Sequence, residues 1–207
     1  MKFEWRKKEK KLYLPKGKVN IIEVPIHKFI MIEGKGNPNN QEFADKVAVL
    51  YSLAYGIRMM PKKGITPEGY FEYTVYPLEG IWDLTESAKE LDYLNKDELV
   101  YQIMIRQPDF VDEKVFLTAM EQVEKKKPSK YLSDVKFITI EDGLSVQMMH
   151  VGSYDDEAET FKLMNDFIKE NNLERVEMTH REIYLSDARK VEKSKLKTVL
   201  RYRVKRK

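Results

Sequence analysis

The feature that most constrains the fold of this chain is an approximate repeat in its order of predicted elements. Each half contains two strands, a glycine-containing turn, a long helix, a strand, a short helical connection and a final strand. The same interval separates Gly34 from Phe43 in the first half and Gly152 from Phe161 in the second. The repeat predicts an α+β fold of duplicated βαβ-type units related by a pseudo-twofold axis. We expect two antiparallel sheets with helices outside and a central ligand cleft on that axis.

The repeat also predicts the boundaries of the elements. We expect one domain over residues 1–207, with repeats at about 19–107 and 135–205 joined by a helix at 112–127. The first repeat should hold a hairpin of 19–24 and 28–33, a helix at about 40–55, a strand at 70–76, a short helix within 85–94 and a strand at 99–106. The second should hold a hairpin of 135–140 and 144–151, a helix at about 156–171, a strand beginning at 180 and a last strand at 198–204.

Composition narrows the classes of function. The 207 residues include no cysteine, which excludes disulfides, thiolate metal sites and a cysteine nucleophile, and fits a reducing cytoplasm. Charges of both signs are interspersed and the net charge is +3, which argues against direct nucleic-acid binding. No apolar run approaches the roughly 18 residues that span a bilayer. We therefore expect a cytoplasmic protein without a membrane partner, as a monomer or weak dimer.

The segment from residue 180 to 187 reads as a strand that ends in a Ser-Asp turn. Alternation places three side chains on each face: His180, Glu182 and Tyr184 on one, and Arg181, Ile183 and Leu185 on the other. A carboxylate in mid-strand is costly in a dry core but useful in a cleft. A solvent-exposed edge strand is the alternative interpretation.

Aligning the two halves pairs Tyr76 with Tyr184 and sets the neutral Thr74 opposite Glu182. A single carboxylate in an aromatic cleft is the predicted outcome, although the tyrosines could also be ordinary sheet packing. His150 and His180 lack other ligand-type residues at metal spacing in the sequence. We therefore predict no metal site and no cofactor. The Gly-x-Gly at residues 34–36 lacks the third glycine and the βαβ context of a dinucleotide loop.

Several motifs together resemble the GyrI-like small-molecule-binding domains. They are the Val-Gly-Ser-Tyr turn at 151–154, the Tyr-x-x-Glu-Gly-x-Trp segment at 76–82, and His-Arg-Glu-Ile-Tyr-Leu-Ser-Asp at 180–187 followed by Leu-Lys-Thr-Val-Leu-Arg at 196–201. The resemblance covers the chain from about Leu12 onward. With no helix-turn-helix segment before it, the chain is similar to stand-alone members of the family rather than to its transcription regulators. The Gly-x-Gly-Asn-Pro turn and the Leu-Tyr-Leu-Pro-Lys segment resemble a bacterial clade that includes cyclopropanoid cyclopropyl hydrolases.

The resemblance implies a small-molecule site and assigns its residues. In the family a buried glutamate at the centre of the cleft recognises cationic or polar ligands, and Glu182 matches that position. We predict Glu182 and Tyr76 as catalytic residues, and five residues as ligand contacts: Trp82, Tyr154, Tyr184, Thr74 and His180. Trp82 and Tyr154 rest mainly on the resemblance. The expected ligand is a flat aromatic or cationic small molecule.

Three functions remain open at this stage. The first is a hydrolase that opens the cyclopropane of DNA-alkylating natural products by adding water, as a detoxification or resistance activity. A tyrosine would stabilise charge on the carbonyl oxygen, and Glu182, made more basic by burial, would take a proton from water. The second is a non-catalytic binder with Glu182 as counter-ion to a cation over aromatic rings. The third is a topoisomerase inhibitor.

Overall fold

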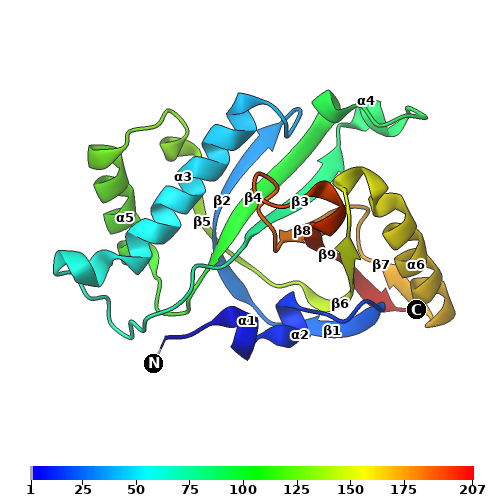
Figure 1. Ribbon diagram of the computed structural model, residues 1–207, viewed down its shortest axis with the longest axis horizontal. Coiled ribbons are helices and arrows are strands. Elements are labelled where there is room, and N and C mark those ends of the chain that lie inside the picture. Colours follow the sequence, from blue (N-terminus) through cyan, green and yellow to red (C-terminus); the bar gives the residue numbers. More distant parts are fainter. Residues whose placement is uncertain (1) are drawn as a thin grey trace. The chain divides into compact units, whose positions relative to one another are not determined.

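The computed structural model describes residues 2–207, which form two compact units (Figure 1). Unit 1 comprises residues 2–4, His27–Leu78 and Asp83–Ile140. Unit 2 comprises Trp5–Ile26, Glu79–Trp82 and Glu141–Lys207. Both units combine antiparallel strands with helices, so the predicted α+β class is confirmed. The duplication and its pseudo-twofold axis stay predictions.

Unit 1 is built around strand β2 (His27–Lys35), which pairs antiparallel with β4 (Leu99–Gln107) and β5 (Lys136–Ile140). Helix α3 (Gln41–Arg58) packs on β2 and β4 and lies beside α5 (Glu113–Lys126). The core consists of fully buried aliphatic side chains from these elements, among them Ile30, Ile32, Leu50, Leu53, Ile57, Ile103 and Ile105. The short helices of this unit are η1 (Met60–Lys63), α4 (Glu86–Lys89), η2 (Lys96–Glu98) and η3 (Leu132–Asp134).

Unit 2 is organised by strand β9 (Lys197–Arg206). One edge of β9 pairs with β6 (Gly143–Val151), and the other pairs with β8 (His180–Tyr184) and then β7 (Leu173–Arg175). Strand β1 (Asn20–Val24) extends the sheet beyond β6, and residues 79–82 of β3 (Leu78–Leu84) extend it beyond β8. All these pairs are antiparallel. Because β8 pairs with β9 along one edge and with β3 along the other, it is an interior strand.

Helix α6 (Glu157–Glu170) covers part of the unit 2 sheet, against β6 and β7 (Figure 1). Its inward residues Met164 and Ile168 join an apolar cluster with sheet residues Val146, Leu173, Leu200, Tyr202 and Val204. The remaining helices of the unit are short: α1 (Trp5–Lys8), α2 (Lys10–Tyr13), η4 (Tyr154–Asp156) and η5 (Lys193–Lys195). The predicted helices at 40–55, 112–127 and 156–171 are thus confirmed as α3, α5 and α6.

Both predicted hairpins are wrong, although all four of their strands exist. β1 pairs with β6, whereas the next strand, β2, pairs with β4 and β5. Each short connection, at residues 25–26 and 141–142, therefore links a strand of one unit to a strand of the other. The reason is that alternation in a sequence fixes which face of a strand is apolar but does not identify its neighbour.

The predicted strand at 70–76 is also wrong. These residues are extended, but their only strand-like pairing within the described chain is an isolated bridge between Tyr73 and Phe3. The Phe3 amide donates to the Glu72 carbonyl over 2.7 Å, and the Thr74 amide donates to the Phe3 carbonyl over 2.9 Å. The aromatic residues that suggested a strand instead pack Tyr73 against the rings of Phe71 and Phe110. The strand begins later, at Leu78, beyond the predicted range.

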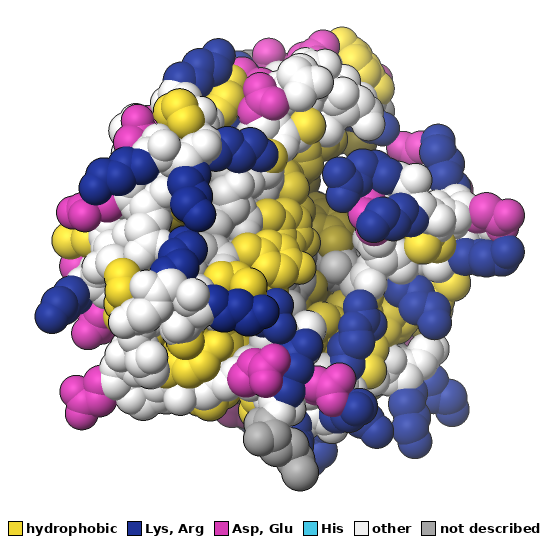
Figure 2. All heavy atoms as spheres, turned by 60° about the vertical axis from the view of Figure 1, so that its left-hand side comes forward, with side chains coloured by type: hydrophobic (Ala, Val, Ile, Leu, Met, Phe, Trp, Pro, Cys, Tyr) yellow, Lys and Arg dark blue, Asp and Glu magenta, His cyan; other side chains and the backbone are white. Residues whose placement is uncertain are grey.

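Within residues 2–207, every helix is too short or too polar to cross a lipid bilayer. Figure 2 shows positively and negatively charged side chains lying among one another over the visible face, as the interspersed sequence charges predict.

The packing of α6 gives a test of the unit 2 core. Met164→Ala should lower the free energy of unfolding by about 2–5 kcal/mol, because Met164 is fully buried and its truncation leaves a cavity. Leu163→Ala on the same helix is the control, since Leu163 is 52% exposed and should change stability by no more than about 0.5 kcal/mol. Urea unfolding followed by circular dichroism measures both, and equal losses would show that α6 does not pack through Met164.

Candidate functional site

Strand register in unit 2 gathers the predicted polar residues on one face of the sheet. His180, Glu182 and Tyr184 alternate along β8 and therefore share a face. On β3, Trp82 lies directly opposite His180, and Gly80 lies opposite Glu182. Residues opposite each other in an antiparallel pair project from the same face. The three residues that the sequence predicted to share a face of β8 therefore do so, and Trp82 lies on the same face of the sheet.

Two hydrogen bonds orient these side chains. The indole Nε1–H of Trp82 donates to the Tyr184 hydroxyl over 2.8 Å. Tyr184 lies close enough to Glu182 to be affected by its charge. His180 Nε2 lies 2.9 Å from Glu182 Oε1. Trp82 therefore orients the Tyr184 hydroxyl, and His180 orients the Glu182 carboxylate.

Gly80 allows this close arrangement. A Cβ atom at residue 80 would lie 2.6 Å from Trp82 Nε1 and 3.2 Å from the Tyr184 hydroxyl. Any side chain there would push the indole off its acceptor. The glycine of the Glu-Gly-x-Trp part of the motif at 76–82 is therefore explained by sterics. The absence of a side chain there leaves room for the Trp82–Tyr184 hydrogen bond.

Aromatic rings surround the buried carboxylate. Tyr154 meets Tyr184 edge to face at 5.8 Å between ring centroids, and Phe161 meets the His180 ring at 4.9 Å. Burial, with the charges of Glu182 and Glu157 adding to it, raises the pKa of Tyr154 to about 12. Burial and the nearby Glu182 carboxylate also raise the pKa of Tyr184 well above its usual value. Both hydroxyls therefore keep their protons at neutral pH and can act as hydrogen-bond donors.

Glu157, the first residue of α6, is a site residue that the sequence analysis missed. It is buried, and burial followed by repulsion from Glu182 raises its pKa to about 9. The signal was present, because Glu157 shares its helical face with Phe161, Met164 and Ile168. An acidic residue on the inward face of a predicted helix is the pattern from which Glu157 could have been predicted.

The structure brings together three groups that can ligate a metal. One ligand atom from each of Glu157, His180 and Glu182 lies within 4.8 Å of the other two. The interpretation that His180 lacks ligand-type neighbours is therefore wrong, because Glu157 comes from a distant element. His150 has the structural environment that we expected, between the Thr160 hydroxyl at 2.9 Å and the Ser153 carbonyl oxygen at 3.0 Å.

The predicted site residues divide between the two units. Unit 2 holds Trp82, Tyr154, His180, Glu182 and Tyr184, whose contacts are described above. Unit 1 holds Thr74 and Tyr76, and their part in the site stays a prediction. Within unit 1, Tyr76 is buried and its ring lies under the Arg106 guanidinium, 4.5 Å from the centroid.

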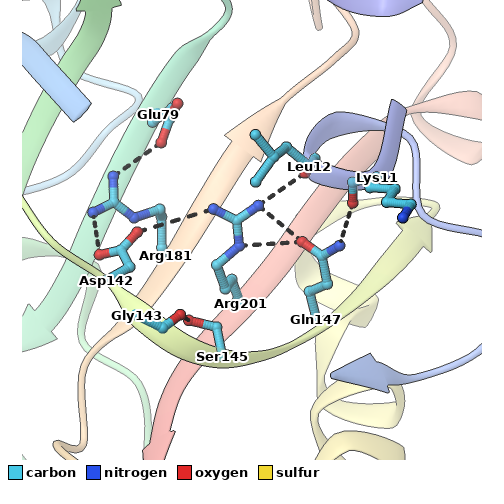
Figure 3. Close-up of polar contacts among 9 residues, drawn as sticks. All are labelled: Lys11, Leu12, Glu79, Asp142, Gly143, Ser145, Gln147, Arg181 and Arg201. Atoms are coloured by element: carbon cyan, nitrogen blue, oxygen red, sulfur yellow. Dashed lines mark hydrogen bonds and ion pairs between the residues drawn. The ribbon is translucent and has the colours of Figure 1, made fainter. Parts of the chain in front are cut away.

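The opposite face of β8 carries a buried ion network (Figure 3). Arg181 donates to Glu79 Oε2 over 2.9 Å and to Asp142 Oδ1 over 2.8 Å. Arg201 extends the network, with Nη1 3.9 Å from Asp142 Oδ2. The side chains of these four residues are at most 7% exposed. Because two positive charges meet two negative ones, the network is neutral in sum.

The same network attaches the N-terminal helices of unit 2. Arg201 donates to Gln147 Oε1 over 2.8 Å and to the carbonyl oxygen of Leu12 over 2.8 Å. Gln147 Nε2 donates to the carbonyl oxygen of Lys11 over 2.7 Å. Two backbone carbonyls of α2 are thereby satisfied by side chains of the sheet, as Figure 3 shows. One face of β8 thus serves stability and the other carries the site.

Unit 2 thus combines antiparallel strands and a helix with a buried polar cluster that lies among aromatic rings. The family model of GyrI-like small molecule binding domains matches residues 17–205. The chain belongs to this family.

Solved structures agree with this assignment. Two proteins from Listeria innocua, each described as a hydrolase, share 38% and 39% identity, with TM-scores of 0.88 and 0.90. Those matches cover 98% and 99% of this chain and 100% of each relative. The EcmrR C-terminal domain, at 12% identity and a TM-score of 0.53, shares the fold; the match covers 92% of this chain and 98% of that domain. Comparison with curated proteins gave no match.

The buried network predicts a large effect of removing Arg181. Arg181→Met should destabilise the protein by about 3–5 kcal/mol, because Glu79 and Asp142 would remain buried without their main partner. Arg189→Met is the control, since Arg189 is 86% exposed in its ion pair with Asp187 and should cost about 1 kcal/mol or less. Urea unfolding decides; a loss of under 1 kcal/mol for Arg181→Met would contradict the role given to the network.

Proposed function

We propose that this protein is a hydrolase that adds water to the cyclopropane ring of cyclopropanoid DNA-alkylating natural products. The reaction would detoxify these compounds. The observation that carries the proposal is the buried Glu182 carboxylate, which His180 orients and which lies near the Tyr184 hydroxyl that Trp82 holds. A carboxylate held beside protonated hydroxyls supplies a base and donors in one place.

The chemistry requires one bond to form and one to break. The water oxygen bonds to the cyclopropane CH₂ carbon while the carbon–carbon bond to the spiro centre breaks. The released electron pair passes through the dienone ring to its carbonyl oxygen, which becomes a phenolate and then takes up a proton to give the phenol. In the proposed mechanism Glu182 takes the proton from water and later returns it to solvent, and a tyrosine hydroxyl donates a hydrogen bond to the carbonyl oxygen. The rings of Trp82, Tyr154 and Tyr184 would contact the flat part of the substrate.

Two further observations support a hydrolase. The relatives from Listeria innocua that are described as hydrolases match nearly the whole chain at 38–39% identity. In this chain, Glu182 is 8% exposed, so its carboxylate is shielded from bulk water and therefore suited to activating a single held water molecule. The substrate class itself rests on the resemblance of the motifs.

A non-catalytic binder is the second candidate. The family is described as small-molecule-binding, and a carboxylate among aromatic rings suits an organic cation without any chemistry. The two functions make opposite demands on Glu182. A base is needed only for turnover, whereas a counter-ion is needed for affinity.

Glu182→Gln separates the candidates. It keeps the shape and removes the base, so hydrolysis of a duocarmycin-like cyclopropane should fall by about 10²–10⁴-fold, while affinity for a neutral flat ligand changes little. Turnover is measured by mass spectrometry as addition of water, and affinity by fluorescence titration. Glu192→Gln, at an exposed residue of the same charge, is the control and should behave as wild type.

The binder gives the reverse result. In that case the wild-type protein binds such compounds without ever releasing a hydrated product, and Glu182→Gln weakens binding of cationic ligands. That outcome would replace the hydrolase by the binder.

A further inference from the structure

Unit 2 holds two buried carboxylates that have no lysine or arginine partner among the described residues. Glu157 is 7% exposed and Glu182 is 8% exposed. Glu182 pairs with His180, and within residues 2–207 no lysine or arginine forms an ion pair with either carboxylate. Two neighbouring acids in a low-dielectric site repel each other unless a positive charge or a proton lies between them. This pair of acids is therefore a place where a bound cation would be stabilised.

An orphaned atom marks where the missing partner belongs. Glu157 Oε1 is buried and has no hydrogen-bond partner among the described residues. The same side chain contributes a ligand atom within 4.8 Å of those from His180 and Glu182. Buried polar atoms in folded proteins are almost always satisfied, so an orphaned oxygen on a side chain of this three-residue cluster points to a bound species.

The geometry of the chain builds the cluster from rigid elements. His180 and Glu182 are two residues apart on one face of β8, an interior strand. Glu157 comes from the first turn of α6, which the buried Met164 anchors on the sheet. Phe161 packs edge to face on the His180 ring and limits its rotation. Three ligands held in this way need little rearrangement to meet one ion.

We propose that Glu157, His180 and Glu182 form a binding site for a divalent transition-metal ion such as Zn²⁺. One imidazole nitrogen and two carboxylates are a ligand set that suits Zn²⁺, Mn²⁺ or Fe²⁺, whereas Mg²⁺ and Ca²⁺ prefer oxygen ligands alone. Three protein ligands leave a coordination position open for water or another small ligand. On binding, the ion replaces the hydrogen bond between His180 and Glu182. The site does not depend on the hydrolysis proposed above.

The test is titration of the chelator-treated full-length protein with ZnCl₂ by isothermal calorimetry. We expect saturable binding of one ion per chain and weaker binding of MgCl₂. Glu157→Gln and His180→Asn should each weaken Zn²⁺ binding by at least about 10–100-fold, because removing a direct ligand costs no less than disturbing an outer-shell partner. Glu159→Gln, an exposed residue two positions along the same helix, removes the same charge and should bind as wild type.

Thermal unfolding gives an independent readout on the same proteins. Zn²⁺ should raise the Tm of wild type and Glu159→Gln but have little effect on Glu157→Gln and His180→Asn. Either an absence of saturable binding by folded wild type or equal binding by all variants would overturn the site. The hydrolysis assay should be run in the presence of a chelator, so that its result does not depend on a bound metal ion. Failure of the metal site then leaves the proposed hydrolysis untouched, and failure of hydrolysis leaves the metal site untouched.

Discussion

The structure of unit 2 depends on how strand β8 places charged side chains on both of its faces while both of its edges are paired. Arg181 on one face is compensated by Glu79 and Asp142, at 2.9 and 2.8 Å. Without these partners, an arginine in an interior strand would carry a desolvation cost that the surrounding apolar packing could not offset. Because Arg181 meets its partners only when β8 is paired as observed, these ion pairs fix the register of β8. A shift by one residue would bring Arg181 into the site and Glu182 among the arginines.

The fixed register explains why Glu182 has its neighbours. Trp82 and Tyr184 approach each other only because Gly80 leaves space between β3 and the hydroxyl. Trp82 thereby orients the Tyr184 hydroxyl near the carboxylate, and His180 orients the carboxylate itself. Glu157 adds a second acid from α6, so the site combines a held carboxylate, protonated hydroxyls and a histidine within one unit. Such a combination of groups suits either recognition of a small molecule or chemistry on one.

The sequence predicted the local elements of the structure correctly and the strand partners wrongly, and both outcomes have physical reasons. Helical periodicity located α3, α5 and α6, and alternation assigned the two faces of β8 correctly, because both patterns are local. Strand partners are not local: Arg181 meets residues 39 and 102 positions away, and β1 pairs with β6 rather than with the adjacent β2. The aromatic run at 70–76 reflected burial of Tyr73 against other rings rather than a strand. Glu157 was missed because an acid at a helix start is usually a cap, and only its position on the inward face distinguishes it.

The central claim is that Glu182 acts as a base toward water and does not itself attack the substrate. Single-turnover reaction of the protein, in excess over a duocarmycin-like cyclopropane, in ¹⁸O-labelled water tests this most directly. The account predicts that the hydrated product carries one labelled oxygen from the first turnover, while the peptide containing Glu182 stays unmodified and unlabelled. A covalent adduct on Glu182, or label that enters its carboxylate before the product, would contradict the account and identify Glu182 as the nucleophile.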